Sequence, residues 1–417
     1  MKKVLALLLA AVLVFSFAAC SGSKDNTTTT AGADESTSAA PTDVDYSKVK
    51  VGLICLHDEN STYDNNFIQA LKDTQTKLGL KDDQVLIKTN IGEDDSCLNA
   101  AQELADAGCN IIFADSFGHE TFMMQAAKEF PEIQFCHATG THSKTAELKN
   151  FHNAFAAIYE GRYLAGVAAG MKLNEMIKDG KIKADEAKIG YVGAFNYAEV
   201  VSGLTSFFLG ARSVCESATM KVTYTNSWFD IALEREAALS LIKDGCVLIS
   251  QHADSEGAPK ACEEKKVPNV AYNIDTSSMG PNTALISSKI NWSPYYELAI
   301  TAVAKGEEFA TDWCGTLATG SVQLTKLNEA VAAEGTQAAL DEAIAKLEKG
   351  ELKVFDTATF TVDGKALDSY KADVIPDEKF EKDTEVIKDG VFCESDVDGM
   401  RSAPYFDIMY IDGISEK

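Results

Sequence analysis

Short apolar runs alternate with amphipathic stretches through the first half of the chain. Residues 49–56 are mostly apolar, as expected of a buried strand, and polar residues follow at 57–60. In the next stretch, Phe67, Leu71 and Leu78 share one face of a predicted helix. This alternation of strand and helix predicts a parallel sheet with crossover helices, the α/β class. Further strands are predicted at 84–87, 110–113 and 133–137, and helices at 96–107 and 123–129.

The same pattern returns in the second half of the chain. A strand is predicted at 188–193, a helix at 234–243 and another strand at 246–251. The echo extends to residues, since Gly108-Cys109 follows the earlier helix and Gly245-Cys246 follows the later one. Two similar α/β units predict two lobes with a ligand cleft between them, faced by the loops at the carboxyl ends of the strands.

The expected first lobe comprises residues 47–155 with 276–310, and the second comprises 156–275 with 311–417, including a C-terminal extension. Residues 293–305 read as a helix, with Ser293 as N-cap and Pro294 at the first helical position. A charged amphipathic helix is predicted at 337–350. The alternating segment Lys353–Phe360 is predicted to pair across a hairpin turn at Asp363-Gly364.

The N-terminus has the layout of a secretory signal. Lys2 and Lys3 precede an apolar run from Val4 to Phe15, and two small residues stand directly before Cys20. The alternative, a transmembrane anchor, is disfavoured because the run is short and ends in polar sequence. We therefore expect a signal peptide at 1–19, a lipidated Cys20 and a flexible linker over 20–46. This predicts a lipid-anchored protein on the extracytoplasmic side of the cell membrane.

Charge and composition exclude several classes of function. The chain has 38 Lys and Arg against 63 Asp and Glu, a formal net charge of −25, which disfavours nucleic acid and anionic membrane surfaces as partners. The cysteines after Cys20 are scattered singly, without CxxC or zinc spacing, so a disulfide scaffold is excluded although a single bridge is not. The spacing of His137, His142 and His152 fits no metal site, and we expect neither metal nor cofactor. Nucleophile and phosphate-binding motifs are also absent from the sequence, so an enzyme is not expected.

Motifs spread along the chain resemble those of a known family. Taken together and in their order along the chain, they resemble the BMP family (basic membrane protein, PnrA-like) of ABC-transporter substrate-binding lipoproteins. The resemblance covers roughly residues 48–317, and residues 350–356 resemble a C-terminal motif of the family. The matching stretches are Ser116-Phe117-Gly118, residues 126–131, His137-Ala138-Thr139-Gly140, residues 159–166, residues 209–214, Trp228-Phe229-Asp230, residues 235–238, residues 251–255 and residues 291–296.

The resemblance implies a type I periplasmic-binding-protein fold, in which two Rossmann-like lobes with parallel sheets are joined by three hinge crossings. It also implies a monomer that holds a purine nucleoside or nucleobase between aromatic rings and delivers it to an ABC permease. Tyr63 and Trp228 match the stacking positions, although residues 57–60 replace the glycine-rich loop of many relatives. The full set of implied ligand contacts is Asp58, Tyr63, Ser116, Phe117, Trp228, Asp254, Asp275 and Trp292.

Each of these residues has a structural alternative. Trp228 sits in a polar loop before a helix, which favours the cleft over core packing. Tyr63 fits an exposed turn as well as a cleft, and Asp58, Asp230 or Asp254 fit a helix-capping role. At the level of the whole protein, the alternatives to import are a surface receptor or adhesin with another small polar ligand, and a nucleoside-cleaving enzyme, for which we expect no turnover.

Overall fold

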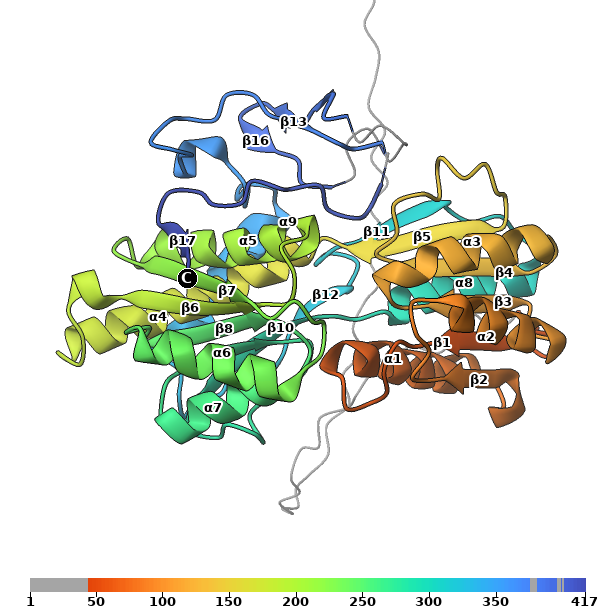
Figure 1. Ribbon diagram of the computed structural model, residues 1–417, viewed down its shortest axis with the longest axis horizontal. Helices are drawn as coiled ribbons and strands as arrows, with labels where there is room; N and C mark the ends of the chain where they lie inside the picture. Colours follow the sequence, from red (N-terminus) through yellow and green to blue (C-terminus); the bar gives the residue numbers. More distant parts are fainter. Residues whose placement is uncertain (1–43, 376–380, 396–398, 400) are drawn as a thin grey trace, which may run out of the picture. The chain divides into compact units, whose positions relative to one another are not determined.

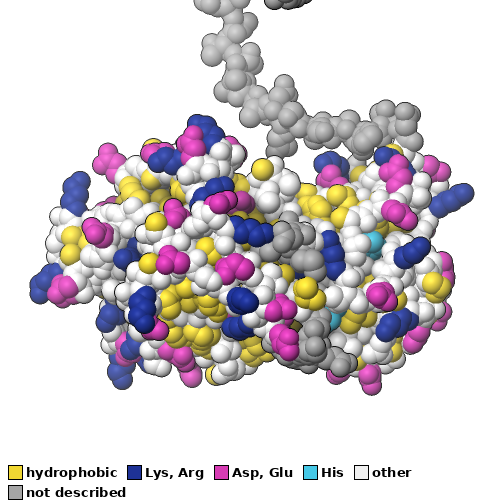
Figure 2. All heavy atoms as spheres, turned by 90° about the horizontal axis from the view of Figure 1, so that it is seen from above, with side chains coloured by type: hydrophobic (Ala, Val, Ile, Leu, Met, Phe, Trp, Pro, Cys, Tyr) yellow, Lys and Arg dark blue, Asp and Glu magenta, His cyan; other side chains and the backbone are white. Residues whose placement is uncertain are grey.

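The computed structural model describes residues 44–375, 381–395, 399 and 401–417 (Figure 1). The predicted signal peptide, Cys20 and nearly all of the expected linker lie outside these residues. No helix in the described ranges is both long and apolar enough to cross a membrane. On the face seen in Figure 2, the described lysine and arginine side chains are dispersed among acidic ones rather than gathered in one basic patch.

The first sheet has the strand order β11-β5-β4-β3-β1-β2, with every pair parallel. Side chains of α1 and α8 cover one face of this sheet, and side chains of α2 and α3 cover the other. Burial on both faces explains why these strands are mostly apolar rather than alternating. The elements are β1 (Val51–Ile54), α1 (Thr62–Leu78), β2 (Val85–Lys88), α2 (Asp95–Asp106), β3 (Ile111–Ala114), α3 (Glu120–Glu129), β4 (Gln134–Ala138), β5 (Phe151–Ala156), α8 (Ser293–Lys305) and β11 (Asp312–Gly315).

The second sheet has the order β12-β10-β9-β8-β6-β7-β17 and is parallel except for β12, which runs antiparallel to β10. Helices α4 and α5 pack on one face, and α6 and α7 on the other. The elements are α4 (Ile158–Lys178), β6 (Lys188–Gly193), α5 (Ala198–Val214), β7 (Thr219–Tyr224), α6 (Ile231–Lys243), β8 (Leu248–His252), α7 (Gly257–Lys265), β9 (Asn269–Tyr272), β10 (Ala284–Ile290), β12 (Val322–Leu324), α9 (Thr336–Glu348) and β17 (Ile414–Glu416).

The two sheets repeat one topology, as the sequence echo predicts. The order β2-β1-β3-β4-β5 in the first corresponds to β7-β6-β8-β9-β10 in the second. Gly108 and Gly245 have φ angles of 88° and 86°, a conformation that favours glycine. The residue after each glycine donates its backbone N–H to a carbonyl of the preceding helix, from Cys109 to Leu104 (3.0 Å) and from Cys246 to Leu241 (3.1 Å). The echoed residues therefore build the same turn from helix to strand in both lobes.

The described chain crosses between the sheets three times: after β5, after β10 and after β11. Two of the expected lobe boundaries are wrong. Residues 284–290 were assigned to the first lobe, but β10 extends the second sheet beside β9, and β11 joins the first sheet beside β5. The chain returns to the first lobe only with α8, because the repeated α/β pattern of the second lobe runs on through its fifth strand. Helix α8 has Trp292 rather than Ser293 at its N-cap position.

Helices α4 and α5 approach each other at backbone distance. A methyl group added to Gly166 would lie 2.0 Å from the carbonyl oxygen of Phe207. One added to Gly210 would lie 2.0 Å from the carbonyl oxygen of Tyr163. Both are far inside van der Waals contact, so each helix needs a glycine where it meets the other.

The C-terminal region packs on the second lobe. The rings of Phe355 and Phe406 stack at 4.6 Å, Phe392 lies 4.5 Å from Phe406, and all three belong to the core beneath α4 and α5. The predicted strand at Lys353–Phe360 is wrong, because Asp356 caps a 3₁₀ turn at Thr357–Thr359. The tight turn at Asp363-Gly364 does form, with positive φ at both residues, but it pairs only Val362 with Lys365.

Buried thiols are spread through both lobes. Burial raises the pKa of the Cys97 thiol to about 12 and that of Cys109 to about 11, which keeps both protonated at neutral pH. These cysteines act as small apolar side chains of the core. The buried and unbridged cysteines are Cys55, Cys97, Cys109, Cys136, Cys215, Cys246 and Cys262.

Candidate functional site

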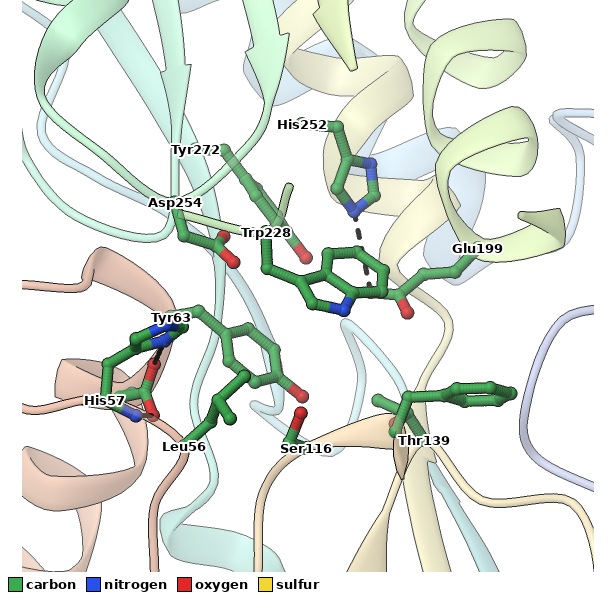
Figure 3. A pocket seen from close by; sticks show the side chains of 12 residues that line it. Leu56, His57, Tyr63, Ser116, Thr139, Glu199, Trp228, His252, Asp254 and Tyr272 are labelled. Atoms are coloured by element: carbon green, nitrogen blue, oxygen red, sulfur yellow. Dashed lines mark hydrogen bonds and ion pairs between the residues drawn. The ribbon is translucent and has the colours of Figure 1, made fainter. Parts of the chain in front are cut away.

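A pocket of about 410 Å³ lies between the carboxyl-terminal edges of the two sheets (Figure 3). Loops after β1, β3 and β4 form its first-lobe wall, and residues at the ends of β8 and β9 and after β6 and β7 form the second-lobe wall. This is where open parallel sheets of this strand order bind ligands. The lining residues are Leu56, His57, Tyr63, Asp64, Ser116, Phe117, Thr139, Glu199, Trp228, His252, Asp254 and Tyr272.

Aromatic rings from both lobes line the pocket. Tyr63, near the start of α1, donates its hydroxyl hydrogen to the carbonyl oxygen of Asp115 at 2.8 Å, which fixes the ring from the first lobe. Trp228 stands opposite on the second lobe (Figure 3). Its ring packs edge-on against that of Phe195 at 4.9 Å. The carbonyl oxygen of Trp228 accepts the backbone N–H of Asp254 at 3.0 Å, so the ring and that carboxyl group are held together. Each lobe therefore contributes one aromatic ring to the pocket wall.

The lobes touch at the rim of the pocket. The side chains of Phe117 and Tyr197 are 46% and 45% exposed, and their rings lie 5.9 Å apart across the cleft. A second contact joins the rings of His57 and Phe229 at 5.3 Å. The backbone N–H of Thr62 donates to the carbonyl oxygen of Asp254 at 2.8 Å. The structure is thus a closed arrangement, in which the rim shields the pocket.

Asp254 is the central carboxyl group of the second-lobe wall. It is 6% exposed, points toward Trp228 and Tyr63 (Figure 3), and accepts one hydrogen bond from Asn273 Nδ2 at 3.1 Å. Burial, and then the negative charge of Glu234, raise the pKa of Asp254 well above its usual range. A ligand that donates a hydrogen bond to this group would relieve that cost.

Two further carboxyl groups organise the first-lobe loop. Asp64 accepts the backbone N–H of His57 at 2.8 Å, and Asp115 accepts that of Leu56 at 3.1 Å. With Cys55 they form a buried group whose ligand atoms lie within 4.8 Å of one another. Burial raises the pKa of Asp115 and of the Cys55 thiol well above their usual ranges. Because Asp64 and Asp115 each accept a backbone N–H of the loop, this cluster fits a role as scaffold for the loop.

Ser116 lines the pocket, but its hydroxyl group already donates a hydrogen bond within the protein. It donates to Glu93 Oε1 at 2.6 Å, and the same oxygen accepts the backbone N–H of Gly118 at 2.7 Å. The ring of His137 contacts the carbonyl oxygen of Ser116 at 2.7 Å. His142 and His152 likewise have protein partners, Glu120 at 2.7 Å and Gln134 at 2.9 Å. These contacts give all three histidines structural roles.

Five of the residues expected from the sequence line this pocket: Tyr63, Ser116, Phe117, Trp228 and Asp254. Three do not. Asp58 turns back to accept the backbone N–H of Asn60 at 3.0 Å, and the exposed Asp275 does the same for Ser277 at 2.8 Å. Trp292 is 2% exposed and stacks on Phe67 at 4.3 Å in the first-lobe core. Asp230 caps α6, accepting the backbone N–H of Leu233 at 2.9 Å.

Seven lining residues were not expected from the sequence. His252 and Tyr272 are the last residues of β8 and β9, and Thr139 directly follows β4. The rule that ligands meet the carboxyl ends of parallel strands would have found these three. Glu199 lies in the first turn of a helix after β6, where no periodicity marks it. The remaining residues are Leu56, His57 and Asp64.

Stability should fall as the pH rises, because Glu234 is buried beneath the Asp254 loop. Its two oxygens accept the backbone N–H of Ser255 at 3.1 Å each, and burial raises its pKa from 4.5 to about 7. The folded protein thus holds a proton that the unfolded chain releases above about pH 4.5, and this contribution to stability is lost as the pH rises to about 7. We expect about 2–3 kcal/mol less stability from this group at pH 8 than at pH 5.

Urea unfolding at the two pH values measures this loss in the protein and in Glu234→Gln. The glutamine variant should show a shallower dependence on pH. An equal dependence in both would contradict the assignment. Glu394, whose pKa burial also raises to about 7, should account for part of the remaining slope.

Two lobes of this topology, crossed three times by the chain and closed on a pocket, define a solute-binding protein of the type I periplasmic-binding fold. Residues 51–354 match the family described as ABC transporter substrate-binding protein PnrA-like, or Bmp, and the chain belongs to this family. The family resemblance and the expectation that the protein is not an enzyme are thereby confirmed.

Two relatives and two solved structures are similar to this chain. A purine-binding protein of Brucella abortus is 33% identical over 74% of this chain and 83% of its own length. A putative ABC transporter glucose-binding protein of Haloferax volcanii is 34% identical, over 56% of each chain. A solute-binding protein of an ABC transporter system from Conexibacter woesei shares the fold with a TM-score of 0.60 and 20% identity, over 73% of this chain and 98% of its own. Another from Aeropyrum pernix shares the fold with a TM-score of 0.61 and 15% identity, over 73% of this chain and 92% of its own.

Proposed function

We propose that this protein captures a purine nucleoside or nucleobase in the pocket between its lobes and delivers it to an ABC permease. The observation that carries the proposal is the opposed pair Tyr63 and Trp228, with Asp254 beside them. A flat heterocycle gains about 0.5–1.5 kcal/mol from each ring contact beyond the burial of its surface. The purine-binding relative from Brucella abortus supports the same ligand class.

The proposed ligand donates hydrogen bonds and carries no negative charge. Asp64, Glu199 and Asp254 all line the pocket, and no lysine or arginine is among its lining residues. Ring N–H groups, amino groups and ribose hydroxyls can donate to these carboxyl groups, whereas a phosphate would meet no lysine or arginine and would be repelled at close range by ionised carboxylates.

A nucleotide should therefore bind far more weakly than its nucleoside. We expect the Kd of AMP to exceed that of adenosine at least about 100-fold, equal to about 2.7 kcal/mol. Isothermal titration calorimetry of the two ligands at pH 7.5 provides the measurement. Affinities within threefold of each other would show that the phosphate avoids the carboxyl groups and would remove the charge argument.

A ligand screen tests the function itself. A purine nucleoside or base should raise the melting temperature, since a ligand that binds only the folded state stabilises it by RT ln(1 + [L]/Kd). Glucose belongs in the same screen, because the Haloferax volcanii relative is named as a putative glucose-binding protein and carboxyl groups beside aromatic rings also suit a sugar. A shift with glucose and none with any purine would overturn the proposal.

The anchoring that we propose rests on the N-terminal sequence. Signal cleavage before Cys20 and lipidation of its thiol would leave the folded lobes on the extracytoplasmic face, as a monomer beside the permease. A Cys20→Ser variant should leave the membrane fraction and appear in the soluble exported fraction. Retention of that variant in the membrane would contradict lipid anchoring.

A further inference from the structure

The second-lobe wall carries a polar cluster whose residues the sequence had not singled out as ligand contacts. His252 and Tyr272 are 2% and 1% exposed, and their rings lie 4.6 Å apart. The Tyr272 hydroxyl has no hydrogen-bond partner within the described part of the chain. His252 Nε2 lies 3.5 Å from Glu199 Oε1, longer than a normal hydrogen bond. Buried polar groups left in this state at a pocket wall point to a polar ligand.

A buried cation stands behind the cluster. Arg162 is fully buried and donates from Nη2 to the carbonyl oxygen of Gln251 at 2.8 Å, directly before His252. Its guanidinium group also lies 5.0 Å from the centre of the Tyr272 ring. Arg162 thus fixes both the strand end that carries His252 and the ring beside it. Burial first, and the Arg162 charge last, lower the pKa of His252, which is therefore neutral at pH 7.

The surroundings of the imidazole define which nitrogen carries its proton. At Gly203, one helical turn after Glu199, an added methyl group would meet His252 Nδ1 at 2.6 Å and Arg162 Nε at 3.8 Å. Neither His252 Nδ1 nor Arg162 Nε has a hydrogen-bond partner within the described ranges. His252 Nε2 is the ring nitrogen that lies near the Glu199 carboxylate, so we assign the proton to Nε2. Glu199 stands in the first turn of α5, the end of a helix where acidic side chains interact favourably with the helix dipole.

We propose that Glu199 selects ligands by the hydrogen-bond donors on the edge of the heterocycle, with His252 and Arg162 as its positioning residues. This inference rests on the proposed purine function and specifies its selectivity. Glu199 lines the pocket and lies beside the ring of Trp228 (Figure 3). An amino group or a ring N–H donates to this carboxylate. An edge with acceptors alone leaves a nearly buried anion without a donor.

Three nucleosides that differ only at that edge provide the test. Adenosine presents an amino group, inosine a ring N–H, and unsubstituted purine riboside only acceptors. Titration calorimetry should show adenosine and inosine binding at least about tenfold tighter than purine riboside. In Glu199→Gln the ratio should shrink to within about threefold, because the amide can donate to the acceptor edge. The control Glu236→Gln, which removes the same charge from an exposed position on α6, should keep the original ratio.

Several outcomes would overturn the inference. Equal affinities of the three nucleosides for the unmodified protein, or an unchanged ratio in Glu199→Gln, would exclude Glu199 as the selecting group. Equal losses for all three ligands in that variant would place its contact at the ribose and overturn the assignment to the base edge. If none of the purines binds the unmodified protein, the proposed function fails before any variant is compared.

The positioning role has its own readout. His252→Gln retains an N–H near the place of Nε2 and should keep most of the selectivity, whereas His252→Leu should lose it. If His252 had a purely structural role, His252→Leu would weaken the binding of all three ligands by the same factor and leave their affinity ratios unchanged. Unchanged ratios in His252→Leu would therefore overturn the positioning role.

Discussion

Replacing Trp228 with alanine is expected to weaken purine binding by about 30-fold or more while leaving the protein folded. Buried tryptophans at binding sites commonly contribute 2 kcal/mol or more when truncated to alanine, and about 2 kcal/mol corresponds to about 30-fold in Kd. Trp228 packs against the second-lobe core with part of its ring and lines the pocket with the rest, so its loss removes one side of the stacking site. Calorimetric titration with the best-binding nucleoside gives the Kd, and circular dichroism reports the fold.

The matched control is Trp228→Phe, which retains a ring in the same place and should lose less than about tenfold. The same comparison at Trp292, buried in the first-lobe core, should change stability rather than the contacts made by the ligand. A Trp228→Ala protein that binds purines within threefold of the original affinity would exclude stacking on this ring.

A single methyl group added at Gly166 is expected to have the largest effect on stability. In Gly166→Ala the new methyl group would lie 2.0 Å from the carbonyl oxygen of Phe207, so α4 and α5 must separate. Overpacking of this kind costs typically 1–3 kcal/mol, and we expect about 3 kcal/mol because the obstacle is backbone rather than a side chain that can rotate. The gain in helix propensity, about 1 kcal/mol for alanine over glycine, is too small to offset the clash.

Scanning calorimetry measures the change in melting temperature, with Ala338→Val as the control. Ala338 is exposed on α9, where added volume meets solvent and costs at most about 0.7 kcal/mol of propensity. If Gly166→Ala melts within a degree of the original protein, the close approach of the two helices is not real.

Periodicity predicted the fold because both sheets are buried on both faces. The first strand and the helix after it were expected near residues 49–56 and 67–78 and are found at Val51–Ile54 and Thr62–Leu78. The early start of α1 depends on Ser61, whose side chain accepts the backbone N–H of Asp64; the sequence pattern did not mark this cap. The pattern of apolar residues could not predict which sheet β10 and β11 join, because an apolar run does not indicate which of two similar sheets it belongs to.

The candidate site was predicted in part. Residues in loops that follow strands, such as Trp228 and Ser116, were placed by the family motifs and line the pocket. Asp58 and Asp275 do not line this pocket, and each carboxylate accepts a backbone N–H two residues ahead, a local contact that competes with any ligand. The cluster of Arg162, His252 and Tyr272 comes from three distant segments, and only the folded structure shows that they meet.

The three chain crossings constrain how the protein can move and how it is made. Three connections lying between the same two bodies resist twisting and separation, leaving a bending motion as the soft one. They also divide the synthesis of the first lobe into two stages. Its strands β1 to β5 are synthesised first, but its edge strand β11 follows only after more than a hundred further residues have formed the second lobe. Until then β5 presents an unpaired edge, which is open to pairing with a strand of another chain.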